Sequence, residues 1–441
     1  MFQFVVFILM CLLYIIQSIY SVEFIDIMFI LISILAFQQA FSKLDKRNRI
    51  FTGFLFLTGI IINFIYGYRG LGLFDGITQN LPLLAIILLA PLISLPLRGE
   101  GVITTVIHKM SEYRDDDRKI FNGVTSFMTM LAPILNMGAI RIIHGFIEDL
   151  KFDNKLLSHA YYGGFTPAVV WSPFFASVGV VISMAEMSYI SYMPVGIVFA
   201  AIQFTIAMLI MRPSKKVSES CSEIGDNTAK KDYILLSLFI LLLISLLIIL
   251  EVITGLPILL LVSINCIVIP ALWTLIRNKK RWMAKQINEF KNQMVSKTNM
   301  EAALFLSAGL FGSALMNTPI ATVLKRAITW SAQGTVLLVF IFVIVFITLM
   351  AFLGIHQIIS TPIVFPLLLT PEIDVTLHTA AFMCIYTWMF SSSISPLNAL
   401  NIIISNCIHV NGIKVAFNWN GRFFITSFVI ACIYVVILNQ F

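Results

Sequence analysis

Long apolar runs separated by short polar turns make up most of the chain. Nine of these runs cover residues 2–20, 24–41, 50–66, 81–97, 192–211, 233–250, 256–276, 302–324 and 423–438. About 18 consecutive apolar residues are enough for a helix to cross a bilayer. Two further runs, 156–184 and 376–408, have that length but carry prolines in their middle. The pattern predicts an all-α polytopic membrane protein with about eleven transmembrane helices.

Two other apolar segments are expected to enter and leave the membrane on the same side. Residues 121–147 carry Asn136 and Gly138 in their middle and are followed by a short polar stretch, which predicts a re-entrant hairpin with its tip at these residues. Residues 336–370 are the expected second hairpin, with its turn over 354–362. The segments 98–119 and 325–335 precede the hairpins and are predicted to lie along the membrane interface.

Each of these two runs, 156–184 and 376–408, has a Ser-Pro pair at a matching place. These pairs are Ser172-Pro173 in residues 156–184 and Ser395-Pro396 in residues 376–408. A proline inside a helix removes a backbone hydrogen bond, and non-helical backbone at membrane depth must be buried in protein or line a watery cavity. Interrupted spans in corresponding halves of a chain indicate the binding site of a transporter. Counting the same number of residues towards the N-terminus from each Ser-Pro pair places the hairpin tips near Asn136 and Ile359.

The only long polar linker, residues 212–232, divides the chain into two halves. We expect a leading transmembrane helix over 1–22, a first repeat over 23–211 and a second repeat over 233–441. The first repeat contains the hairpin 121–147 and the broken helix 156–184, and the second contains the hairpin 336–370 and the broken helix 376–408. An odd number of crossings between equivalent elements predicts that the two repeats are inverted.

Composition and charge fix the orientation. The chain of 441 residues is 59% hydrophobic and 12% charged, and its net charge of +7 comes from short basic loops. Such loops lie in the cytoplasm, so the basic segments 43–49 and 277–297 place the N-terminus inside and the C-terminus outside the cell membrane. The charge therefore reflects topology, and no nucleic-acid partner is expected. The first 20 residues lack the features of a signal peptide and are expected to be retained.

The architecture resembles the ion transporter superfamily, which includes the divalent anion/sodium symporters, the aminobenzoyl-glutamate transporters and the citrate carriers. Symporters of this kind have Ser-Asn-Thr at each hairpin tip, where this chain has Asn136 in the first and Ser360-Thr361 in the second. Their unwound helices carry Thr-Pro-Pro-Asn-Ala-like runs, similar to residues 395–399 and less so to residues 172–176. The resemblance implies a homodimer in which a hairpin-bearing domain moves against a fixed scaffold, as in an elevator.

Helix N-termini exposed at breaks and hairpin tips suit an anion, whereas freed carbonyls and hydroxyls suit a cation. The candidate solute-binding residues are Asn136, Gly138, Thr166, Ser172, His356, Gln357, Ser360, Thr361, Ser393, Ser395 and Asn398. The candidate ion-binding residues are Asn136, Ser172, Ser392 and Ser395. For each hydroxyl, a bond back to its own helix is the alternative.

Other polar residues have two interpretations each. His356 is a candidate for proton coupling, or a neutral histidine that caps the turn. Arg141 either contacts the carboxylate of a solute, or it pairs with Glu148 or extends to the cytoplasmic interface. Asn398 and Asn401 either face the cavity or bond a neighbouring helix.

Acidic residues lie only in loops or at span ends, and the cysteines have no metal-ligand spacing. A membrane enzyme would need such groups near the midplane, so we expect no enzyme and no cofactor other than a coupling ion. The expected function is secondary transport of a small anionic organic solute of the carboxylate type, coupled to Na⁺ or H⁺. The alternative is a cation/proton antiporter or an inorganic oxyanion exporter on the same scaffold.

Overall fold

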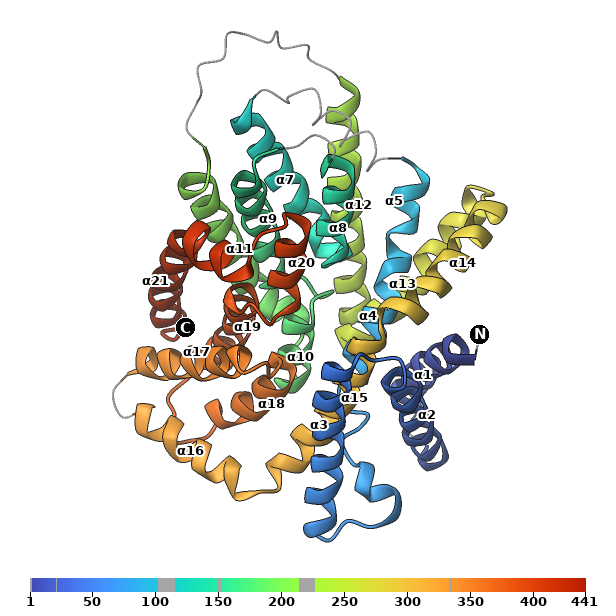
Figure 1. The fold of residues 1–441 in the computed structure, drawn as a ribbon, viewed down its shortest axis with the longest axis vertical. Coiled ribbons are helices and arrows are strands. Elements are labelled where there is room, and N and C mark those ends of the chain that lie inside the picture. The colour runs from blue at the N-terminus through green and yellow to red at the C-terminus, as the bar shows by residue number, and fades with distance from the viewer. Residues whose placement is uncertain (1, 21, 102–115, 149–151, 214–226, 333–334) are drawn as a thin grey trace. The chain divides into compact units, whose positions relative to one another are not determined.

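The computed structural model describes residues 2–20, 22–101, 116–148, 152–213, 227–332 and 335–441, and every regular element in these ranges is helical (Figure 1). Nine helices within the described ranges are long and apolar enough to cross a membrane. The prediction of a polytopic helical membrane protein is therefore confirmed. The described residues divide into two compact units.

Unit 1 comprises Met1–Leu95, Leu256–Trp330 and Ile358–Leu367. Its helices are α1 (Phe2–Ile19), α2 (Glu23–Phe41), α3 (Lys46–Ile65), η1 (Gly70–Phe74), α4 (Leu81–Ile93), α13 (Ile258–Ile276), α14 (Lys280–Lys297) and α15 (Asn299–Met316). Helices from the two halves of the sequence pack in pairs, α3 against α15 and α4 against α13. The ring of Phe37 on α2 stacks on that of Phe56 on α3 with 4.0 Å between centroids.

Unit 2 comprises Pro96–Gly255, Ser331–Gln357 and Leu368–Phe441. Its helices are α7 (Asp117–Leu135), α8 (Gly138–Ile147), α9 (Asn154–Val169), α10 (Ala176–Met184), α11 (Tyr189–Ile210), α12 (Asn227–Thr254), α17 (Val336–Phe352), α19 (Leu377–Ile394), α20 (Ala399–Cys407), η3 (Lys414–Trp419) and α21 (Gly421–Leu438). Helix α9 packs against α7 and α11, and α19 packs against α17 and α21. The green helices α9 to α11 and the red helices α19 to α21 lie side by side (Figure 1).

Three short helices lie where the chain passes between the two units, namely α5 (Leu95–Gly99), α16 (Pro319–Ala332) and α18 (Gln357–Leu368). The expected span 302–324 ends earlier, at Met316, and the chain starts a new helix at Pro319. Proline favours a helix start because its missing N–H would have no partner there. Most of the expected interfacial segment 98–119 and of the polar linker 212–232 lies outside the described residues.

Each segment expected to be a hairpin contains two helices separated by a turn, and the second segment turns earlier than expected. In the first, α7 and α8 are joined at Asn136 and Met137, with Asn136 in the left-handed region at φ 51°. In the second, α17 ends at Phe352 and α18 begins at Gln357. The turn is thus shorter than the predicted 354–362 and is made by Gly354 at φ 87°, a conformation that glycine adopts without strain. Pro362 lies within α18, where it leaves one carbonyl without its helical donor but does not end the helix.

Candidate functional site

The two broken helices have the same local construction. Each break separates a long helix from a second helix of nine residues, which begins at Ala176 in one case and Ala399 in the other. After each nine-residue helix the chain enters the left-handed region at a residue other than glycine, Glu186 with φ 48° and His409 with φ 53°. Both pairs of equivalent residues are 223 positions apart, so the two breaks are in register.

In the first break, a serine fastens the unwound chain to the first hairpin. The buried Ser172 Oγ donates a hydrogen bond of 2.6 Å to the Pro133 carbonyl on α7. The same oxygen accepts a bond of 3.3 Å from the backbone N–H of Phe174. Pro133 lies three residues before the left-handed Asn136, so Ser172 bonds the last turn of α7, next to the hairpin tip.

The second break repeats both bonds. The buried Ser395 Oγ donates 2.8 Å to the Ala351 carbonyl on α17 and accepts 3.3 Å from the N–H of Leu397. Ala351 lies three residues before the left-handed Gly354. The structural counterpart of Asn136 is therefore Gly354, and not Ile359 as counting along the sequence suggested.

The tip of the first hairpin is bonded directly to the first break. Asn136 Nδ2 donates to the Phe174 carbonyl at 3.4 Å, and Asn136 Oδ1 accepts from the Met137 N–H at 2.7 Å. Gly138 begins α8, and a Cβ atom added there would meet no heavy atom within 4 Å apart from its chain neighbours and its own helix backbone. Asn136 thus lies between the hairpin and the break, next to a backbone position with open space around it.

Buried amides connect the second hairpin to the second break. Gln357 Nε2 donates to Ser391 Oγ at 2.8 Å, and Gln357 Oε1 accepts from Asn398 Nδ2 at 3.0 Å. Asn398 is also the N-cap of α20, since its Oδ1 accepts from the Ala399 N–H at 3.2 Å. These side chains are all buried, and the half-buried His356 beside them lies edge-on to the Trp388 ring with 5.9 Å between ring centroids.

Other predicted site residues are arranged differently. The hydroxyl of Thr166 donates to the Tyr162 carbonyl, and those of Ser392 and Ser393 donate to the Met389 carbonyl, so all three bond their own helices. Arg141 is exposed on α8.

Ser360 and Thr361 are buried within α18. Their hydroxyl oxygens have no hydrogen-bond partner among the residues that the structure describes.

Three tyrosines that sequence reasoning did not identify bond the carbonyls released by the breaks. Tyr192 Oη donates to the Val170 carbonyl and Tyr189 Oη to the Trp171 carbonyl, both at 3.0 Å. In the second break, Tyr162 Oη donates 3.1 Å to the Ser393 carbonyl. A tyrosine in an apolar span must find a partner for its hydroxyl, and that requirement is the sequence signal available for these residues.

The site offers donors and dipoles instead of charged side chains. The first turns of α8, α10 and α20 begin at the hairpin tip and at the two breaks and contain no acidic residue. Each such N-terminus carries about half a positive charge and free amides, which suits an anion. No group of three or more metal-ligating side chains occurs in the described part of the chain.

No protein-family model matches this sequence, and no curated protein matches it.

Proposed function

We propose that this chain is a secondary transporter of the cell membrane that moves a small anionic organic solute of the carboxylate type, coupled to Na⁺ or H⁺. One observation carries the proposal: Ser172 and Ser395 each make the same two hydrogen bonds, one across to a hairpin arm and one within the break. A single Ser-Pro kink could make such bonds by chance. The same bonds at both breaks, in register with equal helices, favour an inverted repeat built around one site.

The donors around the breaks support an anionic solute. The tip and break residues 133–138, 170–176, 351–357 and 394–399 contain no Asp or Glu. A bound carboxylate would therefore meet the amides of Asn136 and Asn398 and the N-termini of α8, α10 and α20 without like-charge repulsion. The carbonyls of Val170 and Trp171 each accept one bond from a tyrosine and have a second lone pair, so they are the oxygens available to a coupling cation.

We further propose that the protein is a homodimer with its N-terminus in the cytoplasm, and that unit 2 carries the solute across the membrane by an elevator movement. Both breaks, helices α7 and α8, and the turn before α18 belong to unit 2, which supports a single carrying body, whereas Ile358–Leu367 of α18 belongs to unit 1. Light scattering of the detergent-solubilised protein, corrected for bound detergent, would measure the dimer. A monomer at micromolar concentration would contradict this part of the proposal.

Uptake of radiolabelled carboxylates into proteoliposomes tests the function. Inward Na⁺ or H⁺ gradients should drive accumulation of at least one mono-, di- or tricarboxylate. The double variant Ser172→Ala/Ser395→Ala should have an initial uptake rate at least tenfold below that of the wild type, because both breaks lose their bonds to the hairpins. Ser263→Ala is the matched control, since this buried hydroxyl on α13 bonds its own helix, at the Leu259 carbonyl.

Two further readouts separate this proposal from other functions. Proton movement reported by a pH dye and driven by cations alone, without any carboxylate, would identify a cation/proton antiporter. Turnover of a lipid-linked substrate in the absence of gradients would identify an enzyme. If the double serine variant took up carboxylates at the wild-type rate, the assignment of the two breaks to the transport site would be wrong.

A further inference from the structure

Helix α14 concentrates the charge of the chain. Residues 277–297 contain seven basic side chains and one acidic side chain, so this segment accounts for six of the seven net positive charges. The basic residues are Arg277, Lys279, Lys280, Arg281, Lys285, Lys291 and Lys297. The sequence suggested a cytoplasmic loop, but the structure has a helix over Lys280–Lys297. The charges are thereby arranged on a defined surface.

The apolar side of α14 is already occupied by unit 1. Met283, Phe290 and Met294 recur at helical spacing and are buried. Helix α14 packs against α1, α4, α13 and α15, and the ring of Phe290 meets that of Phe4 edge-on with 6.4 Å between centroids. Helix α14 therefore does not need to insert into lipid to bury its apolar side.

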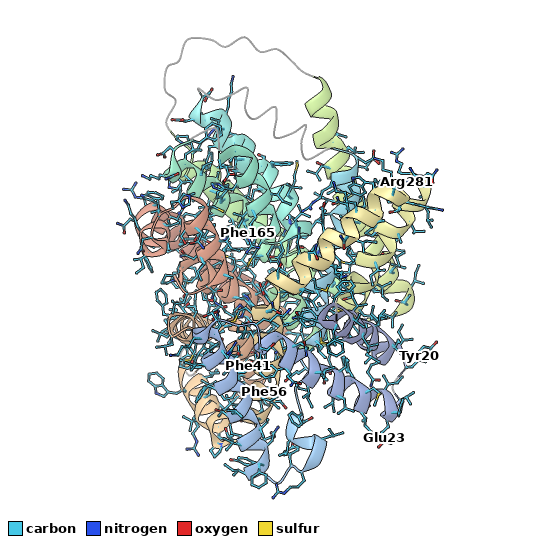
Figure 2. All side chains as sticks on the ribbon, turned by 45° about the vertical axis from the view of Figure 1, so that its right-hand side comes forward. Tyr20, Glu23, Phe41, Phe56, Phe165 and Arg281 are labelled. Atoms are coloured by element: carbon cyan, nitrogen blue, oxygen red, sulfur yellow. The ribbon has the colours of Figure 1, made fainter. Side chains whose placement is uncertain are left out.

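The opposite side of α14 is charged and accessible. Lys280, Arg281 and Lys285 are exposed, and we call these three residues the α14 surface. Figure 2 shows Arg281 on the outer side of α14, away from the other helices of unit 1. Lys280 and Arg281 lie in the first helical turn, which contains no acidic residue. Cations at this end oppose the helix dipole, so an external anion would relieve an unfavourable arrangement.

The end of α13 places the α14 surface at the level of lipid headgroups. Leu272, Leu275 and Ile276 are 52%, 62% and 80% exposed, as expected for a membrane span that faces lipid to its last residue. The basic segment starts one residue later. The rings of Trp273 and Trp282 lie edge to face at 5.5 Å, and tryptophan is enriched at the membrane–water interface.

We propose that the α14 surface binds the phosphate groups of anionic phospholipids. Three exposed cations next to the lipid-exposed end of a span attract anionic headgroups, and the interfacial tryptophans hold the helix at that depth. A lipid is favoured over a free phosphate ion because the adjoining face of α13 offers apolar side chains to the acyl chains. This inference does not depend on the proposed transport function.

Native mass spectrometry of the detergent-solubilised full chain, titrated with phosphatidylglycerol or phosphatidylcholine, tests the inference. Wild-type protein should bind phosphatidylglycerol at least tenfold more tightly than phosphatidylcholine. The variant Lys280→Gln/Arg281→Gln/Lys285→Gln should bind phosphatidylglycerol about 100-fold more weakly, because three basic residues near the headgroup are lost. Its affinity for phosphatidylcholine should be unchanged.

The control variant Lys46→Gln/Lys155→Gln/Arg422→Gln removes the same charge from three separate exposed positions. It should change phosphatidylglycerol affinity by less than about threefold, because a charge distant from the headgroup is screened. Equal losses in both triple variants would overturn the proposal, since they would reflect net charge alone. Displacement of phosphatidylglycerol by millimolar inorganic phosphate would also overturn it, since the surface would then bind phosphate and not lipid.

Discussion

At the scale of single residues, the breaks depend on donors that come from distant parts of the sequence. An unpaired backbone carbonyl in lipid costs several kcal/mol. Here Tyr189 and Tyr192 supply donors to the first break, while Tyr162 and Asn401 both donate to the Ser393 carbonyl of the second. These side chains therefore determine which carbonyls remain open to a ligand.

Tyr162→Phe tests this role of the tyrosines. The Ser393 carbonyl keeps its bond from Asn401 but loses the one from Tyr162, so stability should fall by about 1 kcal/mol. The initial rate of carboxylate uptake should also fall, by more than the loss of folded protein alone would cause, because the carbonyl is no longer held in place. Thermal unfolding in detergent and initial uptake rates would measure the two effects. The exposed Tyr66→Phe is the control, and wild-type values for both measurements in Tyr162→Phe would contradict the assignment.

At the scale of elements, a glycine allows the first hairpin to approach its broken helix. A Cβ atom on Gly164 of α9 would lie 2.5 Å from the Thr125 carbonyl oxygen and 2.6 Å from the Met128 Cβ, both on α7. Small residues let membrane helices approach this closely and gain van der Waals contact. The position of the hairpin, and hence of Asn136, thus depends on a residue that bears no functional group.

Gly164→Ala should separate α7 from α9 and lower the unfolding free energy by about 1 to 3 kcal/mol, as overpacking does in other cores. Gly312→Ala is the matched control, because a Cβ on this residue of α15 would meet no heavy atom within 4 Å apart from its chain neighbours and its own helix backbone. Alanine is also the better helix former by about 1 kcal/mol, so Gly312→Ala should be neutral or stabilising. Thermal unfolding in detergent compares the two variants. Equal unfolding temperatures would show that the close approach of α7 to α9 does not require glycine at position 164.

At the scale of the whole molecule, the proposed inversion of the two halves has a direct topological consequence. The turns at Glu186 and His409 follow the equivalent helices α10 and α20. If the halves are inverted, these turns lie on opposite sides of the membrane, with Glu186 outside and His409 inside.

Cysteine labelling in intact cells tests the inversion. In a background with the six native cysteines replaced by alanine, Glu186→Cys should react with a membrane-impermeant maleimide added outside. His409→Cys should react only after the cells are permeabilised. Labelling of both turns from the same side would contradict the inverted repeat, and with it the proposed arrangement of the transport site.

The amino-acid sequence by itself determined the membrane class, the helical fold and the places of the two breaks. These properties are local, because a run of apolar residues partitions into lipid wherever it occurs and a proline in the interior of a helix removes a hydrogen bond. For the same reason Ser172 and Ser395 could be singled out from their neighbouring prolines. The exact turn of the second hairpin was not predicted. The sequence suggested a turn that extends to Pro362, whereas the left-handed Gly354 makes the turn in the structure.

Only the tertiary structure decided how the polar groups pair. Equal spacing could not reveal that Gly354 corresponds to Asn136, because that match is defined by which carbonyl each serine reaches. Nor could it assign Tyr162 to a carbonyl 231 positions away. Hydrogen bonds between distant segments depend on packing that brings the segments together, and the sequence pattern specifies which groups need partners without specifying which partners they find.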